Sequence, residues 1–530
     1  MSPSPPPPSL AADFPALSSA WTQTLLSPAN RAHNSRLDPN YFAASPSSNL
    51  VTLSRVRSFG LGTGDQLVHA LAADGLAAAT RRELVLVTCF WARASRSRAR
   101  VAQLLRALSA KALRRGGGAG RIRVAICFSS RSLWQKLLGP SGVRGAVYGP
   151  AAWAAKLGLP PPEELRGLEL RVKCVFVRPF SVMHPKFVVV DRERVFVPSF
   201  NVSWEEWFEG CVELEGPVVG RFVRFWREFW VRDGGEEEED WDGDVGVERD
   251  GGEGESVRDD TFPGSNANAA TDGPSSNPSA PPSLLPLHRP FSHPAPLPTL
   301  FLPSPHHRNP RFRPLPFLSP PPTPPTPLNA LLQHLLSASS SSIYIQTPNA
   351  TAPPPLAALR DALARGVDVT LVTSRRLMLL EQLATAGTTT ARCVRRLCRR
   401  HAALVAARRA RGDGDDEQGG GERTGPGRLR VEYFRAREAG GPGRARKKGK
   451  GRAGAGDEGE PAVGEPVQSH LKLTVVDGAV VVLGSGNMDR ASWFTSQELG
   501  VGLWSREFAA AVMDMVGEGL AGRTEVVYDG

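Results

Sequence analysis

The first thirty residues contain no lysine or arginine, and Asp13 is their only acidic residue. A secretory signal needs a basic start before an apolar run, and a mitochondrial presequence needs arginines along an amphipathic helix, so neither is predicted. No apolar run approaches the roughly 20 residues of a membrane-spanning helix. We therefore expect a cytoplasmic protein that contacts membranes, if at all, from the periphery.

Cysteine is also scarce, with six in 530 residues and none in Cys-x-x-Cys spacing. Most of the cysteines lie in apolar stretches, which predicts buried, reduced thiols and argues against a disulfide framework. Cys393 and Cys398 have no nearby His or Cys cluster that would complete a zinc site. The sequence thus predicts no metal and no cofactor.

Proline and glycine are abundant but unevenly spread. They gather in three stretches that cannot bury enough apolar surface to fold alone. We predict a disordered tail at 1–48, a disordered acidic and Pro-rich linker at 233–326, and a low-complexity basic insert at 412–465. The remaining blocks, 49–232 and 327–530, are the predicted folded halves.

The formal net charge of +11 favours an anionic partner: a phospholipid headgroup, an anionic membrane or nucleic acid. Within the basic insert, the sequence GRARKKGKGR is able to attract such a partner by charge alone, and the alternative is a solvated loop. An acidic run after Asp233 suggests the hypothesis of a weak intramolecular lid over this segment or over a cationic active site.

Both halves show the same alternation of helices and strands. In the first, a helical stretch at 65–82 is followed by strands at 83–91, 122–128, 168–177, 187–190 and 195–197. In the second, strands are predicted at 343–346, 367–372, 471–476 and 479–483. Each half closes with a helix. The chain therefore reads as an internal duplication that packs into an α/β/α/β/α sandwich.

The first closing helix, predicted at 218–230, carries Phe222, Phe225, Trp226 and Phe229. Their spacing is that of a helix stripe facing a core. Contact with lipid is the alternative, and we favour the core.

The two halves share one set of polar residues at identical spacing. The first half contains His184, Lys186, Asp191, Ser199 and Asn201, and the second contains His470, Lys472, Asp477, Ser485 and Asn487. In an extended segment, residues two apart project to the same side, so each His-Lys pair faces one way. Such a pair makes a phosphate pocket with a built-in nucleophile or proton carrier. Since the whole set occurs twice, coincidence is a poor explanation.

These residues closely resemble the signature of the phospholipase D superfamily: His-x-Lys, four residues, Asp, six residues, Gly-Ser or Gly-Gly, x, Asn. The resemblance covers both halves but not the tail or the inserts. Residues 343–374 are also similar to the strand-helix-strand that opens the C-terminal half of bacterial cardiolipin synthase-like members. Pro198 stands where the family usually has glycine, so we expect a changed turn there with the site retained.

The resemblance implies one active site shared by the two halves. One imidazole attacks phosphorus and becomes a phosphohistidine, while the other protonates the departing oxygen and then deprotonates the incoming water or alcohol. The family precedent favours His184 as the nucleophile and His470 as the acid/base.

The resemblance also implies roles for the other residues. Phosphate oxygens are expected to accept hydrogen bonds from Lys186, Lys472, Asn201 and Asn487, with Ser199 and Ser485 nearby. Glu213 and Glu498 are expected behind the histidines, where a carboxylate fixes the tautomer. Asp191 and Asp477 are counted with the catalytic residues, but the family resemblance gives them a supporting and more structural role. The two lysines supply the positive charge, so no metal is required.

Three functions are compatible with these residues. The first is a phospholipid-directed phospholipase D or phosphatidyltransferase, including cardiolipin synthase-like transfer. The second is a nucleic-acid phosphodiesterase, although tyrosyl-DNA phosphodiesterases usually lack the motif aspartate, which is present here. The third is a non-catalytic phosphoester-binding protein, which the intact His, Lys and Asn residues argue against. No stable protein partner is predicted.

Overall fold

The computed structural model describes residues 14–31, 46–115, 120–131, 142–177, 181–204, 206–231, 285–305, 322–410, 425–437 and 464–530. The acidic run at 234–244 and the GRARKKGKGR sequence at 443–452 lie outside these residues, as does the lid hypothesis built on them. No helix within the described ranges is long and apolar enough to cross a membrane.

The first half is built on one mixed sheet. Its strands follow the order β1 (Val51–Thr63), β9 (Trp207–Glu215), β8 (Arg194–Pro198), β7 (Phe187–Val190), β2 (Glu83–Phe90), β3 (Ile122–Ser130), β5 (Leu168–Val177) and β4 (Gly142–Val147). Strands β2, β3 and β5 run parallel, and the other neighbours are antiparallel. Short strands β6 (Ser181–Val182), β10 (Leu287–Pro290) and β15 (Gln468–Ser469) join its edges.

The second half repeats this sheet. Its order is β11 (Leu297–Ser304), β18 (Glu498–Trp504), β17 (Val480–Gly484), β16 (Leu473–Val476), β12 (Ser342–Thr347), β13 (Asp368–Thr373), β14 (Leu429–Phe434) and β19 (Thr524–Asp529). The first four residues of β1 pair with β11 and so join the two sheets. The predicted duplication is confirmed.

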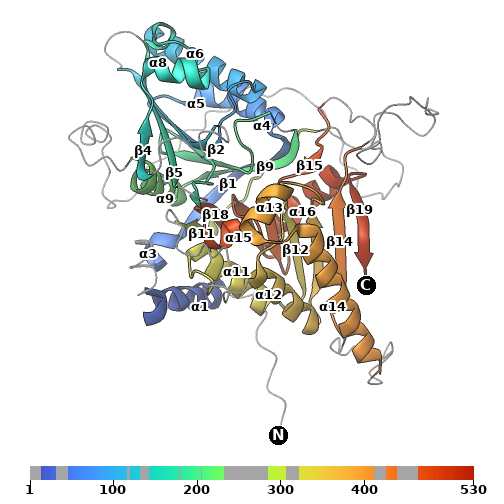
Figure 1. The fold of residues 1–530 in the computed structure, drawn as a ribbon. Coiled ribbons are helices and arrows are strands. Elements are labelled where there is room, and N and C mark those ends of the chain that lie inside the picture. The colour runs from blue at the N-terminus through green and yellow to red at the C-terminus, as the bar shows by residue number, and fades with distance from the viewer. Residues whose placement is uncertain are drawn as a thin grey trace, which may run out of the picture.

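Helices form the remaining layers (Figure 1). The first sheet is covered by α4 (Gly64–Ala70), η3 (Leu71–Leu76), α5 (Ala77–Ala79) and α6 (Arg96–Arg114), with α8 (Pro150–Ala152), η4 (Trp153–Leu157) and η5 (Pro162–Leu165) nearby. The second sheet is covered by α11 (Pro327–Ala338) and α12 (Pro353–Ala364). Between the sheets lie α9 (Pro217–Trp226), which continues into η6 (Arg227–Val231), and α16 (Arg506–Leu520).

The predicted aromatic stripe lies in this middle layer. Phe222 of α9 packs edge-on against Phe187 of the first sheet at 5.2 Å and against Phe301 of the second at 5.1 Å between ring centroids. Phe225, Trp226 and Phe229 are also buried. The core interpretation is confirmed, since these rings bury apolar surface from both halves in one cluster.

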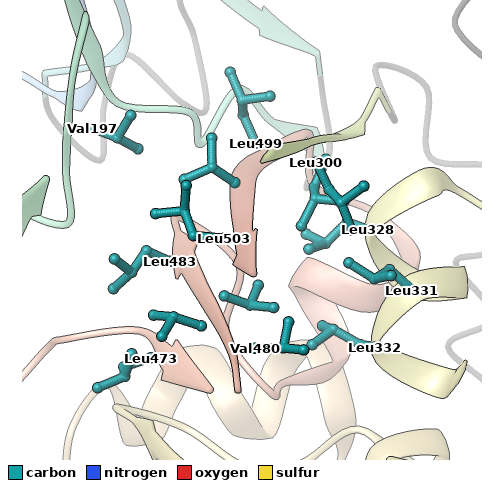
Figure 2. Close-up of a cluster of buried hydrophobic side chains, with 14 of the residues drawn as sticks. Val197, Leu300, Leu328, Leu331, Leu332, Leu473, Val480, Leu483, Leu499 and Leu503 are labelled. Carbon is teal, nitrogen blue, oxygen red and sulfur yellow. The ribbon is translucent and has the colours of Figure 1, made fainter. Parts of the chain in front are cut away.

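Apolar residues at helical spacing fix α11 to the second sheet. Figure 2 shows leucines 328, 331 and 332 of α11 facing the branched side chains of β17 and β18. The sheet residues are Val480, Leu483, Leu499 and Leu503, and Val197 of the first half lies at the border of this cluster.

Three predicted boundaries need correction. Within the predicted insert at 412–465, β14 lies between β13 and β19 as an integral strand of the second sheet. Within the predicted tail, residues 14–31 contain α1 (Phe14–Leu26), which contacts α11 and buries Leu17, Trp21 and Leu25; α3 (Pro46–Leu50) follows. Within the predicted linker, β11 lies between β1 and β18 as an integral strand of the second sheet. The sequence pattern did not reveal α1 and β11, because each is a short apolar segment flanked by Pro-rich sequence.

Candidate active site

The two motif histidines are held at the junction of the halves by backbone hydrogen bonds. His184 N donates to Gln497 O at 2.9 Å, and Gln497 N donates to Val182 O at 2.8 Å. In the same way, His470 N donates to Phe208 O at 2.8 Å. In each case the carbonyl comes from the other half, from the residue immediately before a glutamate.

Each of these glutamates contacts the histidine of the opposite half. His184 Nδ1 lies 2.8 Å and 3.0 Å from the two oxygens of Glu498, and His470 Nδ1 lies 2.7 Å from Glu209 Oε1. A carboxylate at Nδ1 keeps the proton on that nitrogen and leaves Nε2 for chemistry. The two halves thus orient each other's imidazoles.

The carboxylate beside His470 is therefore Glu209, and the prediction of Glu213 is wrong. Glu213 instead accepts hydrogen bonds from Ser58 Oγ at 3.0 Å and Arg194 Nη1 at 3.2 Å. Four residues along a strand displace it by about 13 Å from Glu209. The prediction failed because the serine-to-glutamate separation differs, 10 residues in the first half and 13 in the second. In the second half, α15 (Arg490–Phe494) lies between the serine and the glutamate.

The motif serines hold the glutamates. Ser199 Oγ donates to Glu209 and accepts from Gly210 N at 2.9 Å. Ser485 Oγ donates to Glu498 at 2.5 Å and accepts from Leu499 N at 3.0 Å. With donor and acceptor both used, these hydroxyls position carboxylates, which corrects their expected place at the substrate phosphate.

Pro198 leaves this geometry unchanged. It continues β8 and pairs with Cys211, and Ser199 N donates to Gly210 O at 2.9 Å. The equivalent bond in the second half, from Ser485 N to Leu499 O, measures 3.0 Å. The backbone does differ at this position, because Gly484 has a φ of 154°, which proline cannot adopt, whereas the hydrogen bond from the following serine is retained.

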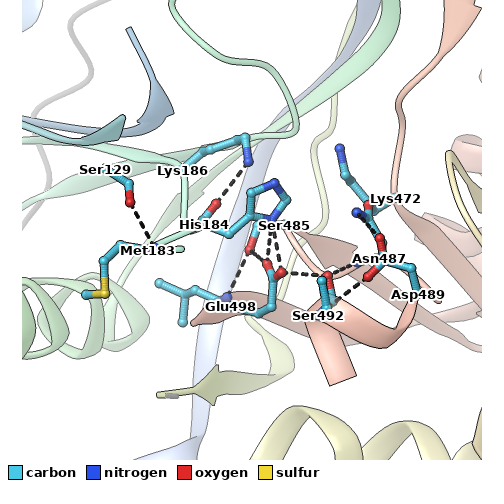
Figure 3. Close-up of polar contacts among 12 residues, drawn as sticks. Ser129, Met183, His184, Lys186, Lys472, Ser485, Asn487, Asp489, Ser492 and Glu498 are labelled. Carbon is cyan, nitrogen blue, oxygen red and sulfur yellow. Dashed lines mark hydrogen bonds and ion pairs between the residues drawn. The ribbon is translucent and has the colours of Figure 1, made fainter. Parts of the chain in front are cut away.

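The two lysines complete one cationic site. Lys186 Nζ donates to His184 O at 2.9 Å, and Lys472 Nζ donates to His470 O at 2.7 Å and lies 2.7 and 2.9 Å from the two ring nitrogens. Both ammonium groups are almost fully buried. Figure 3 shows the first-half pair facing Lys472 and Asn487 of the second half.

The pKa shifts follow from this enclosure and show that the halves act on each other. Burial, with Lys186 as a neighbour, lowers the pKa of Lys472 to about 7. Burial also lowers the pKa of both histidines; Lys472 adds to the effect at His184, and Lys186 adds to it at His470. Cross-half electrostatic coupling places all four groups in one site.

At the two glutamates, burial and the neighbouring cationic groups shift the pKa in opposite directions. Burial raises the pKa of each carboxyl, but the adjoining imidazole and lysine outweigh that effect, so the pKa of Glu209 and of Glu498 is lowered overall. Both are therefore carboxylates at neutral pH, as hydrogen-bond acceptors for Nδ1–H must be.

The two asparagines lie beside this cluster but differ in their contacts. Asn201 Oδ1 accepts from Phe90 N at 3.2 Å. Asn487 is buried, and its Nδ2 donates to Asp489 Oδ2 at 3.1 Å. Its Oδ1 is buried without a hydrogen-bond partner among the described residues.

The motif aspartates stand apart from the histidines, which corrects their inclusion among the catalytic residues. Asp191 and Asp477 each begin a two-residue hairpin turn, with φ of 50° and 51°. Asp191 accepts from the backbone N–H groups of residues 81–83, at 2.7–2.8 Å. Asp477 accepts equivalent bonds from residues 340–342, at 2.8–3.2 Å. Each carboxylate caps the start of the central strand of its sheet.

The two imidazoles differ in access. Trp207 covers His470, with 4.6 Å between ring centroids, and the His470 side chain is only 4% exposed. The His184 side chain is 16% exposed. Across the described residues, no three His, Cys, Asp or Glu side chains gather as a metal site would require.

No protein-family model matches the sequence, and no curated protein matches it. Among solved structures, the chain is similar to phosphatidylserine synthase of Haemophilus influenzae Rd KW20, with a TM-score of 0.50 and 12% identity over 92% of this chain and 91% of that one. It also matches Nuc, a phospholipase D family member from Salmonella typhimurium (17% identity, 38% of this chain and 90% of that one, TM-score 0.23). NucT from Helicobacter pylori matches at 14% identity over 37% and 88% of the two chains, with a TM-score of 0.23. The chain therefore shares its fold, two α/β halves, with the Haemophilus influenzae phosphatidylserine synthase.

Proposed function

We propose that the chain is a phospholipase D-type phosphodiesterase that transfers a phosphatidyl group through a phosphohistidine. The observation that carries this proposal is the exchange of carboxylates between the halves. Glu498 orients His184 and Glu209 orients His470, so two imidazoles present Nε2 to one buried cationic site. A structural histidine needs neither a carboxylate at Nδ1 nor a buried lysine two residues on.

The nucleophile in this proposal is His184, the more exposed imidazole. Its lowered pKa keeps the ring neutral at pH 7, so Nε2 carries a free electron pair. Nε2 attacks phosphorus, the bond to the leaving oxygen breaks, and that oxygen takes a proton from Nε2 of His470. His470 then removes a proton from water or an alcohol, whose oxygen attacks phosphorus and releases His184.

His470 must carry a proton for the first step, although its pKa in the empty site lies at about 3. Binding of the anionic phosphate raises the pKa of His470, because a negative charge beside the ring and beside Lys472 favours the protonated imidazole. Glu209 balances the charge of the imidazolium behind it. Substrate binding is thus what prepares the acid.

The lysines are the phosphate-binding groups. Burial lowers the pKa of Lys472 most, and repulsion from the Lys186 ammonium group adds to that effect. A phosphodiester placed between them relieves this repulsion, and the relief grows as charge builds on the non-bridging oxygens in the transition state.

Phosphatidyl donors are the first substrates to test, because the similar structure that spans both halves is a phosphatidylserine synthase. The purified full chain is incubated in chelator with phosphatidylcholine, phosphatidylglycerol or single-stranded DNA, with ethanol as acceptor. We expect lipid turnover with transfer to ethanol. Cleavage of DNA alone would move the substrate to nucleic acid, and no turnover of any of them by the folded chain would refute the proposal.

The intermediate is tested by rapid acid-free quenching with phosphorus-labelled substrate. We expect the label on His184, accumulating in His470→Asn and absent in His184→Asn. Label on His470 in the wild type would reverse the two roles.

A further inference from the structure

An apolar ridge is exposed on the short helix α13 (Leu379–Ala386). It consists of Met378, Leu379, Leu380 and Leu383, with Leu380 85% exposed and Leu383 45% exposed. We refer to these four residues as the leucine ridge. Large apolar side chains gathered on one face of a surface helix mark an interaction site more often than scattered single ones do.

The ridge is held outward by the inner face of the same helix. Gln382 is buried, and its Oε1 accepts from Thr390 N at 2.6 Å and Thr390 Oγ1 at 3.0 Å. Leu377, just before the ridge, is buried as well. Met378 adopts a left-handed φ of 53°, which a non-glycine residue rarely holds unless its surroundings fix it. The display of the leucines is therefore built into the fold.

Exposed arginines precede and follow the ridge along the chain. Arg375 and Arg376 precede it, and the neighbouring helix α14 (Thr390–Ala410) contains no acidic residue and exposes Arg392, Arg395, Arg396, Arg399 and Arg400. In the described part of the chain, none of these side chains pairs with a carboxylate. Leucines fringed by unpaired arginines suit an anionic lipid interface.

The ridge lies beside the active site. Ser374, at the end of β13, donates to the carbonyl of Ser469 at 3.0 Å, and Ser469 precedes His470. Helix α13 also contacts α15, which begins three residues after Asn487. Figure 1 shows α13 close to α15. In the first half, Trp204 follows Asn201 by three residues and is 60% exposed, so apolar surface flanks the motif there too.

We propose that the leucine ridge and the arginines of α14 form a docking surface for an anionic phospholipid bilayer, which presents lipid to the His184–His470 site. The presentation of substrate rests on the proposed function, whereas the docking itself does not. Charge complementarity favours lipid over a protein partner, because α14 exposes these five arginines and its sequence contains no acidic residue.

Vesicle sedimentation of the full chain tests the docking. We expect binding to vesicles of phosphatidylcholine with phosphatidylglycerol, weaker binding to phosphatidylcholine alone, and release by high salt. The double variant Leu380→Ser/Leu383→Ser should bind roughly tenfold more weakly. Leu113→Ser is the matched control, since Leu113 is 60% exposed on α6 of the other half. It should bind like the wild type.

Replacing Arg395 and Arg399 by glutamine should weaken binding and flatten its salt dependence. The proposal is overturned if the wild type ignores anionic vesicles, or if the leucine variant binds them as well as the wild type does. It is also overturned if the wild type is a dimer that the leucine variant converts to a monomer, because the ridge would then meet a second copy.

A soluble diester, bis(4-nitrophenyl) phosphate, separates docking from catalysis. We expect the leucine variant to hydrolyse it at the wild-type rate while losing roughly tenfold on vesicles. Vesicle binding by a wild type that cleaves no diester would refute the proposed function and leave the docking surface intact. Cleavage of the soluble diester without vesicle binding would refute the docking surface alone.

Discussion

The carboxylate of Glu498 lies 2.8 Å from Nδ1 of His184, although 314 positions separate the two residues. The mirrored pair, Glu209 and His470, is separated by 261 positions and 2.7 Å. Because each pair joins the two halves, neither half contains an oriented histidine of its own. The proposed activity therefore requires the two halves to be docked.

This exchange predicts which glutamates matter. Glu209→Gln and Glu498→Gln remove the charge that balances an imidazolium and misdirect Nδ1–H, so kcat should fall by about 10–100-fold with little change in KM. Glu213→Gln is the control on the same strand, since its hydrogen-bond partners within the described ranges are the side chains of Ser58 and Arg194. Steady-state kinetics with a soluble diester give the comparison. A fall for Glu213→Gln as large as that for Glu209→Gln would contradict the assignment.

The buried lysine predicts a pH-dependent stability. The pKa of Lys472 is about 7 in the folded chain against 10.5 for the free side chain. Between pH 7 and pH 10.5 the unfolded chain binds more protons than the folded chain, so the free energy of unfolding rises with pH. Below pH 7 Lys472 is charged in both states, and its burial destabilises the folded chain by the full amount. Lys472→Met removes that cost and should raise the Tm by about 2–4 °C at pH 6.

The difference should shrink as the pH approaches 10, while the variant stays inactive throughout. Thermal unfolding followed at several pH values measures this. Inorganic phosphate provides a second measurement, because an anion between the lysines should raise the Tm of the wild type far more than that of the variant. A variant less stable than the wild type at pH 6 would show that Lys472 stabilises the empty site.

Much of this arrangement was accessible from sequence, and the failures have physical causes. His184 and His470 each contact a glutamate of the other half, and the family resemblance had implied such an arrangement across the two halves. Glu209 was missed because α15 makes the two halves unequal in length just where the glutamates were aligned. No local pattern reveals a partner that only tertiary contact brings to His470.

The aspartates illustrate a different limit. Their position in the motif resembles that of a catalytic group, but the role depends on a turn geometry that spacing does not specify. Positive φ at Asp191 and Asp477 points each carboxylate back at the amides of a neighbouring strand. The sequence specifies an aspartate at each of these two positions, whereas the backbone conformation of the turn determines which groups its carboxylate contacts.

Asp477→Ala should therefore affect stability and leave catalysis unchanged. Removing an acceptor for three backbone N–H groups should lower the free energy of unfolding by about 2–3 kcal/mol, with kcat unchanged within about twofold. Burial raises the pKa of Asp477, but the amides of Ser342, Ser341 and Ser340 outweigh it and lower the pKa overall. The stabilisation is thus present above pH 3.8 and lost as the pH falls through the folded pKa.

Urea denaturation at pH 7 and at pH 3 tests this expectation. Wild type and Asp477→Ala should differ at pH 7 and converge at pH 3. A large loss of kcat in the folded variant at pH 7 would return Asp477 to the catalytic residues.

The N-terminal helix provides the last prediction. Trp21 is fully buried, and its Nε1 donates to the carbonyl of Pro327, at the start of α11, at 3.1 Å. Trp21→Ala removes a large buried ring and leaves that carbonyl without its partner, so the free energy of unfolding should fall by about 3–5 kcal/mol. Thr22→Ala is the matched control, because Thr22 is on the same helix and its hydroxyl bonds only to Ser19 O at an exposed position. Since α11 packs on β18, which begins with Glu498, the loss should also reach the site: kcat should fall on warming at a lower temperature in Trp21→Ala than in the wild type. Equal stability of the two variants would mean that residues 14–26 are a dispensable tail after all.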